Sequence, residues 1–335
     1  MSAGKVFVCA GEPSGDLYAS LFIKRSKMKI GMDPASEIYG VGGPEMKKAG
    51  VNIMFGYQHL MSFGFAAGIV SADRNYRIYR EVAQAIYLVK PAVFIAVAYP
   101  GVNLLLCRYA KKLGAKVYYL MPPQIWAWGE FRKYFIKKWV DTVISALPFE
   151  YRYYVNLGID TIYIENPLIE ELKKYKRNDF HKRIGVMPGS RPGEIKRNLP
   201  VILNILPELR KENPGIDLCV ILHEKATALR ICSPAFNFEK RYGDINDRYQ
   251  AMRNCDLLVT CSGTASLEAA IMSIPQVFIN RPSFFDYHLF RHFIRIKEYN
   301  LANLFFEKPV VPSIIARSIA KIKKTLMEIL TIEMT

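Results

Sequence analysis

Short apolar runs recur along the chain, and each is followed by a turn of small residues and a stretch of helical periodicity. Runs rich in Val, Ile and Phe are typical of strands that are buried on both faces. In the first half they predict strands at Lys5–Ala10, Glu37–Val41, Val93–Ala98, Lys116–Leu120, Thr142–Ala146 and Thr161–Ile164. In the second half they predict Arg183–Met187, Ile216–Leu222, Asp256–Thr260 and Gln276–Ile279. This alternation predicts α/β architecture, with parallel sheets covered by helices on both faces.

The two halves of the chain begin alike. Val6–Ala10 leads into Gly11-Glu-Pro-Ser-Gly-Asp16, and Ile184–Met187 leads into Pro188-Gly-Ser-Arg-Pro-Gly-Glu194. A strand, a Gly-rich turn and a helix form the opening of a Rossmann-like domain, which binds ligands at the carboxyl ends of its strands. Neither turn matches GxGxxG or a Walker P-loop, which argues against hydride and phosphoryl transfer.

A polar, Lys-rich stretch separates these halves. It covers Glu170–Lys182 and predicts a linker. We therefore expect two doubly wound domains, residues 1–168 and 169–335, with a ligand-binding cleft between the carboxyl ends of their sheets.

The charge of the chain points to an anionic partner. The formal net charge is +16, in a sequence with 51% hydrophobic and 23% charged residues, as in folded globular proteins. Nucleic acid is one candidate, because Trp126–Trp139 interleaves aromatic residues with cations. The cations are spread over many segments and no nucleic-acid-binding signature is present, so we expect no nucleic-acid partner. Acidic membrane surfaces and phosphorylated substrates are the remaining candidates for the anionic partner.

The cysteine spacing and the start of the chain indicate the cellular compartment. The six cysteines form no CxxC pair, which predicts buried free thiols in a reducing compartment and no metal site. Met1–Lys5 leads directly into the first strand, so we expect a cytoplasmic protein. The longest uncharged stretch, Pro91–Cys107, is interrupted by Pro100 and Gly101 and is too short to span a membrane.

The stretch Thr260–Glu268 carries the clearest chemistry. A helix that opens directly behind a buried strand presents unpaired N–H groups and the positive end of its dipole, which favours a phosphate. Ser262 and Thr264 can cap this helix, and Gly263 allows a ligand to approach the backbone closely. Glu268 lies about one turn further on, where its carboxylate can accept hydrogen bonds from sugar hydroxyls. A nucleotide-sugar site and an ordinary capped helix explain these residues equally well.

An apolar segment predicts a membrane contact. Leu60–Val70 contains Phe63 and Phe65 and is followed by Arg74, Arg77 and Arg80. Apolar residues beside cations are typical of interfacial contacts with anionic bilayers. An ordinary loop followed by a core helix is the alternative.

Six motifs, taken together, resemble lipid-A-disaccharide synthase. They are Gly11-Glu-Pro-Ser-Gly-Asp16, Gly40-Val-Gly-Gly-Pro-Glu-Met46, Pro122-Pro-Gln-Ile-Trp-Ala-Trp128, Leu147-Pro-Phe-Glu150, Pro188-Gly-Ser-Arg191 and Ser262-Gly-Thr-Ala-Ser-Leu-Glu268. The resemblance implies a GT-B fold of two Rossmann-like domains and an inverting transfer of diacylated glucosamine from UDP to a lipid monosaccharide phosphate. It also implies a peripheral protein at the cytoplasmic face of the inner membrane that needs no cofactor.

The resemblance also assigns site residues. On the donor side, Arg191 meets the diphosphate, Glu268 holds the ribose and Asn303 lies near the donor, a helix cap being the alternative for Asn303. Acceptor-side residues are expected at the end of the first strand and in later motifs. They are Glu12, Ser14, Asp16, Asn103, Gln124 and Trp126. A carboxylate here can act as base on the attacking hydroxyl, while helix capping explains Ser14 and Asp16 equally well.

Three departures from the family bear on mechanism and assembly. Where the family has Asp-Ala-Pro-Asp-Phe-Asn, this chain has Ala98-Tyr-Pro-Gly-Val-Asn103, so the family's leading candidate for the catalytic base is Ala98 here. The family's Gly-His-Pro is Glu165-Asn-Pro167. We therefore expect Glu12 or Asp16 to be the base. The alternative is a divergent homologue that retains UDP-sugar binding but has another acceptor or no transfer activity. The family forms domain-swapped dimers. The C-terminus is shorter here than is usual in the family, so both a monomer and a homodimer are compatible with the sequence.

Overall fold

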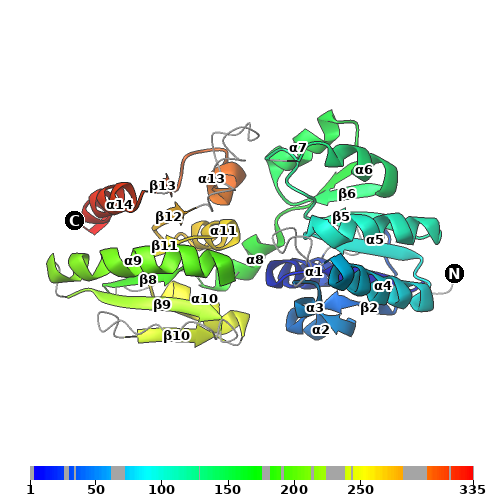
Figure 1. Ribbon diagram of the computed structural model, residues 1–335, viewed down its shortest axis with the longest axis horizontal. Helices are drawn as coiled ribbons and strands as arrows, with labels where there is room; N and C mark the ends of the chain where they lie inside the picture. Colours follow the sequence, from blue (N-terminus) through cyan, green and yellow to red (C-terminus); the bar gives the residue numbers. More distant parts are fainter. Residues whose placement is uncertain are drawn as a thin grey trace. The chain divides into compact units, whose positions relative to one another are not determined.

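The computed structural model describes most of the chain. The described residues are 4–25, 30–33, 35–61, 72–127, 129–175, 182–189, 192–212, 215–223, 238–242, 244–281, 300–316 and 318–334. They form two compact units, Met1–Leu168 and Ile169–Thr335. Each unit contains one sheet with helices packed on it (Figure 1).

The first unit is built on a parallel sheet with the strand order β3-β2-β1-β4-β5-β6-β7. Its strands are β1 (Val6–Ala10), β2 (Ile38–Gly42), β3 (Asn52–Gly56), β4 (Val93–Val97), β5 (Lys116–Leu120), β6 (Thr142–Ser145) and β7 (Thr161–Tyr163). Its helices are α1 (Pro13–Arg25), α2 (Pro44–Lys48), α3 (Tyr57–Met61), α4 (Ala72–Val89), α5 (Pro100–Lys112), α6 (Arg132–Trp139) and α7 (Pro148–Asn156), and α8 (Pro167–Leu172) crosses the boundary. The strand order reverses between β1 and β4, which creates a switch point at their carboxyl ends.

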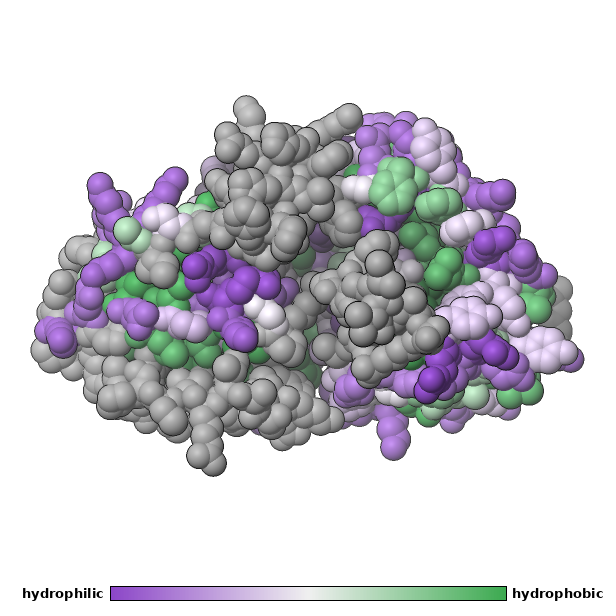
Figure 2. All heavy atoms as spheres, in the orientation of Figure 1, coloured by the Kyte–Doolittle hydropathy of each residue, from purple (hydrophilic) through white to green (hydrophobic). Residues whose placement is uncertain are grey.

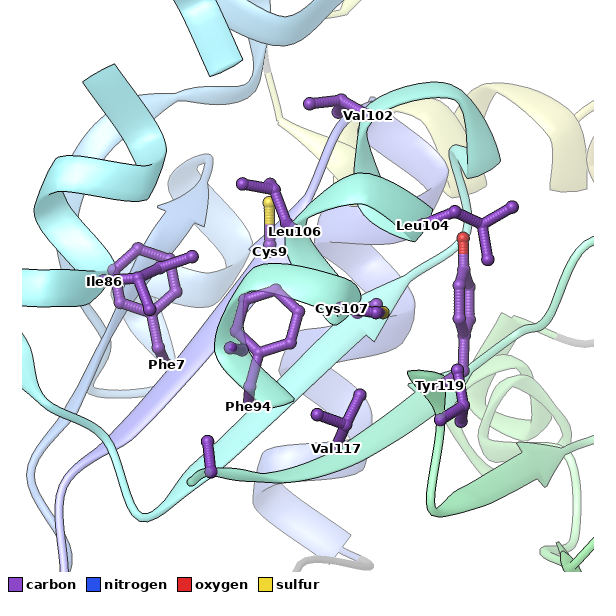
Figure 3. Packing of buried hydrophobic residues seen from close by; sticks show 14 of the residues in the cluster. Phe7, Cys9, Ile86, Phe94, Val102, Leu104, Leu106, Cys107, Val117 and Tyr119 are labelled. Carbon is purple, nitrogen blue, oxygen red and sulfur yellow. The ribbon is translucent and has the colours of Figure 1, made fainter. Parts of the chain in front are cut away.

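Alternate residues along the strands of this unit face two separate hydrophobic cores. Phe7 and Cys9 of β1 face the core that α4, α5 and α6 cover, as Figure 3 shows for this cluster. Val6 and Val8 face the opposite core, which α1 covers. Strands that are buried on both faces need apolar residues at every position, and this explains the uninterrupted apolar runs of the sequence.

The second unit repeats the plan with the order β10-β9-β8-β11-β12-β13, again parallel. Its strands are β8 (Arg183–Met187), β9 (Asp217–His223), β10 (Phe238–Tyr242), β11 (Leu257–Thr260), β12 (Gln276–Asn280) and β13 (Ser313–Ile315). Its helices are α9 (Pro192–Glu212), α10 (Ile245–Arg253), α11 (Gly263–Ile271), α13 (Leu301–Phe306) and α14 (Ile319–Met334). Helices α9 and α14 cover one core, and the switch point lies between β8 and β11.

The predicted α/β architecture of two doubly wound sheets is confirmed. All ten predicted strands are present, with ends within one residue of the prediction, and β3, β10 and β13 are additional. The predicted linker begins just after the boundary between the units, and its first part is helical: Glu170–Leu172 belong to α8 and Lys173–Tyr175 form a 3₁₀ turn. The five cysteines in the described residues are free and buried, and burial raises the pKa of the Cys9 thiol far above its usual range.

Candidate functional site

The turn between β11 and α11 lies at the switch point of the second unit. Ser262 is the N-cap of α11, and its hydroxyl accepts a hydrogen bond from the Ala265 amide at 3.3 Å. Thr264 lies inside the helix, so of the two predicted caps only Ser262 has that role. Ser262, Gly263 and Thr264 are each half-buried, so the opening of the helix remains in part accessible. An accessible helix opening of this kind favours an anion.

Gly263 packs closely against α13 within the unit. A Cβ on this residue would lie 3.3 Å from the Leu301 Cβ, so a larger residue would push against α13. The two helix openings are also joined by a hydrogen bond from the Ser266 hydroxyl to Asn300 Oδ1 at 2.9 Å. Asn300 in turn caps α13 by accepting from the amides of Ala302 and Asn303.

Asn303 supports the backbone that precedes β13. Its Nδ2 donates to the Val311 carbonyl at 2.9 Å, and its Oδ1 accepts from the Val311 amide at 2.7 Å. The side chain is buried and both of its amide atoms bind the chain itself. It is not the cap of α13, since Asn300 fills that position.

Glu268 is a buried carboxylate paired with a cation that the sequence analysis did not identify. It is fully buried, and the Arg248 guanidinium of α10 binds both carboxylate oxygens, with 3.1 Å between Nη1 and Oε1. The Tyr249 hydroxyl also donates to Oε1, at 3.2 Å. Burial raises the pKa of Glu268, while Arg248 and the Tyr249 hydrogen bond oppose this rise. Arg191, the predicted donor-side cation, lies outside the described residues, as does Trp128.

Asp16 has a different kind of partner in the first unit. Its buried carboxylate accepts hydrogen bonds from the amides of Gly43, Glu45 and Met46, at 2.7, 3.0 and 3.1 Å. It therefore caps α2. The alternative considered from the sequence was that Asp16 caps α1, the helix to which it belongs. Burial raises the pKa of Asp16, and the three backbone hydrogen bonds act against that rise.

Glu12 is the more accessible acid at this edge. It lies two residues after the end of β1, it is half-buried, and its Oε1 accepts a hydrogen bond from the Ser14 hydroxyl at 2.8 Å. Because Ser14 binds the carboxylate from two residues away, it fixes Glu12 beside the switch point.

The turn after β4, which carries the departure at Ala98, has an unusual backbone. Ala98 and Tyr99 adopt φ values of 47° and 46°, a left-handed conformation that costs residues other than glycine about 1–3 kcal/mol. Asn103 holds this turn, because its Nδ2 lies 3.1 Å from the Cys9 and Val97 carbonyls and 2.9 Å from the Ala98 carbonyl. The Tyr119 hydroxyl donates to the same Ala98 carbonyl at 2.8 Å. Asn103 is therefore a buried support of the turn at the edge where the acceptor is expected.

The Tyr99 ring lies over Gly11. A Cβ at Gly11 would lie 2.4 Å from the Tyr99 ring, so the first turn of the chain needs glycine at this position. The Tyr99 hydroxyl donates to the Leu60 carbonyl at 2.8 Å. Leu60 begins the predicted membrane segment, but residues 62–71, with Phe63 and Phe65, lie outside the described residues.

The segment after β5 contains Gln124 and Trp126. Gln124 is exposed, and the half-buried Trp126 donates its indole N–H to Glu150 Oε1 at 3.1 Å. Glu150 Oε2 accepts from the Ser145 hydroxyl at 2.8 Å. Because Glu150 is buried and has only neutral donors among these bonds, its pKa rises to about 7. Glu150 belongs to a motif used for the resemblance, but only its burial reveals it as a titrating group.

No group of three or more His, Cys, Asp or Glu side chains in the described part could hold a metal ion. Among the described helices, none is long and apolar enough to cross a bilayer.

Comparison with known proteins places the chain in a family. The lipid-A-disaccharide synthetase family matches residues 6–335. The lipid-A-disaccharide synthase of Nitrosococcus oceani is 34% identical over 325 residues, which cover 94% of this chain and 83% of that protein. The enzyme of Geobacter metallireducens is 31% identical over 322 residues, covering 93% of this chain and 83% of that protein.

A solved structure matches the fold. The UDP-GlcNAc 2-epimerase of Neisseria meningitidis, bound to UDP-GlcNAc, superimposes with a TM-score of 0.62, covering 98% of this chain and 99% of the epimerase at 12% identity. At this identity the likeness bears on architecture alone, and it agrees with a GT-B arrangement of two Rossmann-like units. Taken with the sequence relatives, this shows that the chain belongs to the lipid-A-disaccharide synthase family, whose members are inverting glycosyltransferases of lipid A biosynthesis.

Proposed function

We propose that this chain transfers a diacylated glucosamine from UDP to a lipid monosaccharide phosphate. The family match over residues 6–335 is the observation that carries the proposal. In this reaction an acceptor hydroxyl attacks the anomeric carbon, the new C–O bond forms with inversion, and the bond to the diphosphate breaks. The proton of the hydroxyl passes to a base, and UDP leaves.

The donor is proposed to bind at the second unit. Support comes from the opening of α11, where Ser262 to Thr264 are half-buried and the helix dipole favours the diphosphate. Arg191 adds the cation that a leaving diphosphate needs. Glu268 and Asn303 are buried and bonded within the unit, so we propose that they support the turns beside the nucleotide and do not contact it themselves. The UDP-GlcNAc bound to the Neisseria meningitidis epimerase supports a UDP-sugar as the donor.

The acceptor is proposed to bind at the first unit, with Glu12 as the base. Of the two candidates, Glu12 is half-buried, whereas Asp16 is buried and binds three backbone amides. Ser14 orients Glu12, while Asn103, Gln124 and Trp126 shape the surrounding turns. An anionic membrane surface and a second copy of the chain are the remaining proposed partners, at the cytoplasmic face of the inner membrane.

Product formation tests this proposal. UDP-2,3-diacylglucosamine and 2,3-diacylglucosamine 1-phosphate in mixed detergent micelles should give a disaccharide phosphate by mass spectrometry, with one UDP released per product. Glu12→Gln should lower kcat by about 10²–10⁴-fold. The matched control is Glu37→Gln, an exposed carboxylate that precedes β2 at the opposite edge of the sheet. UDP binding without any disaccharide would contradict the transfer and favour a homologue with another acceptor or no activity.

The donor site has its own test. Arg191→Ala and Ser262→Ala should each weaken UDP binding in isothermal titration calorimetry, because each removes a group from the proposed diphosphate site. Unchanged affinity in both variants would place the nucleotide elsewhere.

A further inference from the structure

Helices α5 and α6 expose a row of aromatic and aliphatic side chains that the proposed chemistry does not use. Phe131, Tyr134 and Phe135 expose 59%, 66% and 38% of their surface, and Leu105 of α5 exposes 40%. A single exposed apolar residue is normal on a protein surface, but neighbouring ones indicate contact with something apolar. In Figure 2, green and pale side chains lie among purple ones over α4, α5 and α6.

The aromatic residues form a ladder along one side of α6. The Phe131 and Phe135 rings meet edge to face at 6.3 Å, and the Phe135 and Trp139 rings stack at 4.8 Å. Spacings of four residues place all three on one side of the helix. The Arg108 guanidinium of α5 lies 5.7 Å from the Trp139 ring centre and joins the two helices. We call this ladder, with Leu105, Arg108 and Tyr134, the aromatic–basic face.

The charge of the two helices is entirely positive. Together α5 and α6 contain no acidic residue and seven cations, which are Arg108, Lys111, Lys112, Arg132, Lys133, Lys137 and Lys138. Near the ends of the helices, Glu130 binds Lys133 and Asp141 binds Lys111. Lys137 and Lys138, in the last turn of α6, are exposed beside the ladder. Exposed aromatic rings that alternate with long cationic side chains suit the boundary between lipid headgroups and acyl chains.

The face adjoins the proposed acceptor edge. In a parallel sheet the helix that follows a strand starts at the carboxyl edge, and α6 follows β5 through the segment that contains Gln124 and Trp126. Phe131, at the start of α6, is therefore the end of the ladder nearest that edge. A membrane held against the ladder would present a lipid headgroup beside the acceptor side of the first unit.

We propose that the aromatic–basic face docks the protein on an anionic lipid bilayer. This inference rests on the proposed function for its purpose, since a lipid acceptor reaches the enzyme from a membrane. The rings insert at the level of the headgroups, and the cations of α5 and α6 bind the negative surface. The aromatic–basic face consists of described residues and does not include the segment Leu60–Val70.

Vesicle sedimentation tests the docking. The full chain should bind phosphatidylcholine vesicles with 30% phosphatidylglycerol and bind pure phosphatidylcholine vesicles at least about tenfold more weakly. Phe131→Ser with Phe135→Ser should weaken binding to the anionic vesicles about tenfold or more, because interfacial affinity scales with buried apolar area. Lys137→Gln with Lys138→Gln should weaken it about 20- to 30-fold at low salt, since each cation near such a surface contributes a factor of about five. The matched control is Tyr87→Ser with Leu88→Ser, which are exposed by 48% and 65% at the end of α4.

The proposal would be overturned by unchanged binding in both face variants, by an equal loss in the α4 control, or by equal binding to neutral vesicles. Binding of a DNA duplex that the aromatic substitutions weaken as much as vesicle binding would also overturn it, in favour of a nucleic-acid surface. Transfer in detergent micelles separates this inference from the proposed function. Face variants should keep micellar activity and lose activity on vesicles. If the unmodified chain forms no disaccharide in micelles, the proposed function is contradicted. The vesicle-binding results would then still test the docking surface independently.

Discussion

The carboxyl edges of the two sheets share a topology but hold their buried carboxylates differently. At the second unit, Glu268 is bound by the Arg248 guanidinium. At the first unit, Asp16 is bound by backbone amides and Glu150 by an indole and a hydroxyl, all neutral donors. The accessible opening of α11 suits a diphosphate at the second edge. Burial raises the pKa of all three carboxylates, and only at Glu268 does a cation act against that rise.

The backbone differs between the edges as well. In the first unit, Ala98, Tyr99 and Met121 all have positive φ after neighbouring strands β4 and β5. In the second unit, the turn after β11 begins with an ordinary extended cap at Ser262. Strain of this kind persists only where surrounding contacts fix it, and Asn103 with Tyr119 supplies those contacts at Ala98.

Breaking the ion pair of the second edge should have the largest effect. Arg248→Met leaves Glu268 buried without its cation, so we expect the second unit to lose about 3–5 kcal/mol of stability. Thermal unfolding followed by circular dichroism measures the loss. Adding Glu268→Leu should restore much of it, because a buried pair can be replaced by apolar residues at little cost. Arg183→Met is the control: it breaks a pair with Asp217 that is about one-third exposed, and it should cost less than about 1 kcal/mol. An equal loss in the control would contradict the account.

Glu150 should make the first unit sensitive to pH. Its pKa rises from 4.5 to about 7, so the folded state binds a proton more tightly than the unfolded state. Stability from this group is therefore greatest below pH 4.5 and falls as pH rises to about 7, by roughly 3 kcal/mol in total. Glu150→Gln should remove this slope, as measured by chemical denaturation between pH 5 and 8. A slope that persists in the variant would assign the titration to another group.

The strained turn gives the smallest expected effect. Ala98→Gly should stabilise the first unit by about 0.5–1 kcal/mol, because glycine adopts positive φ without the penalty that alanine has there. Ala96→Gly, within β4, is the matched control and should destabilise the unit. Thermal unfolding of both variants provides the comparison. Destabilisation by both substitutions would show that Ala98 carries no backbone strain.

The sequence was most informative where one local rule decides the structure. Strands buried on both faces are apolar at every position, so β1, β4 and β11 could be predicted from composition alone. Strand β3 was missed because its residues are exposed or half-buried and its apolar run, Ile53–Phe55, is only three residues long. Ser262 as a cap was also readable, since capping is local.

Contacts between distant residues could not be read in this way. Arg248 and Glu268 are 20 positions apart on different helices, and no spacing rule pairs them. Asp16 was expected as a catalytic or local capping residue, yet it caps a helix that begins 28 residues later. Ala98 gave no sign of a left-handed backbone, because that conformation usually signals glycine. Such features depend on tertiary packing, which brings the ends of separate strands together.

Hydrogen exchange with mass spectrometry tests the assignment of the donor to the second edge most directly. Peptides that cover β11 and α11 should exchange more slowly when UDP is added, and those that cover β1 and the start of α1 should not change. This result would place the diphosphate at the opening of α11. Protection confined to the β1–α1 turn, with α11 unchanged, would contradict the account, because the nucleotide would then occupy the edge that we assign to the acceptor.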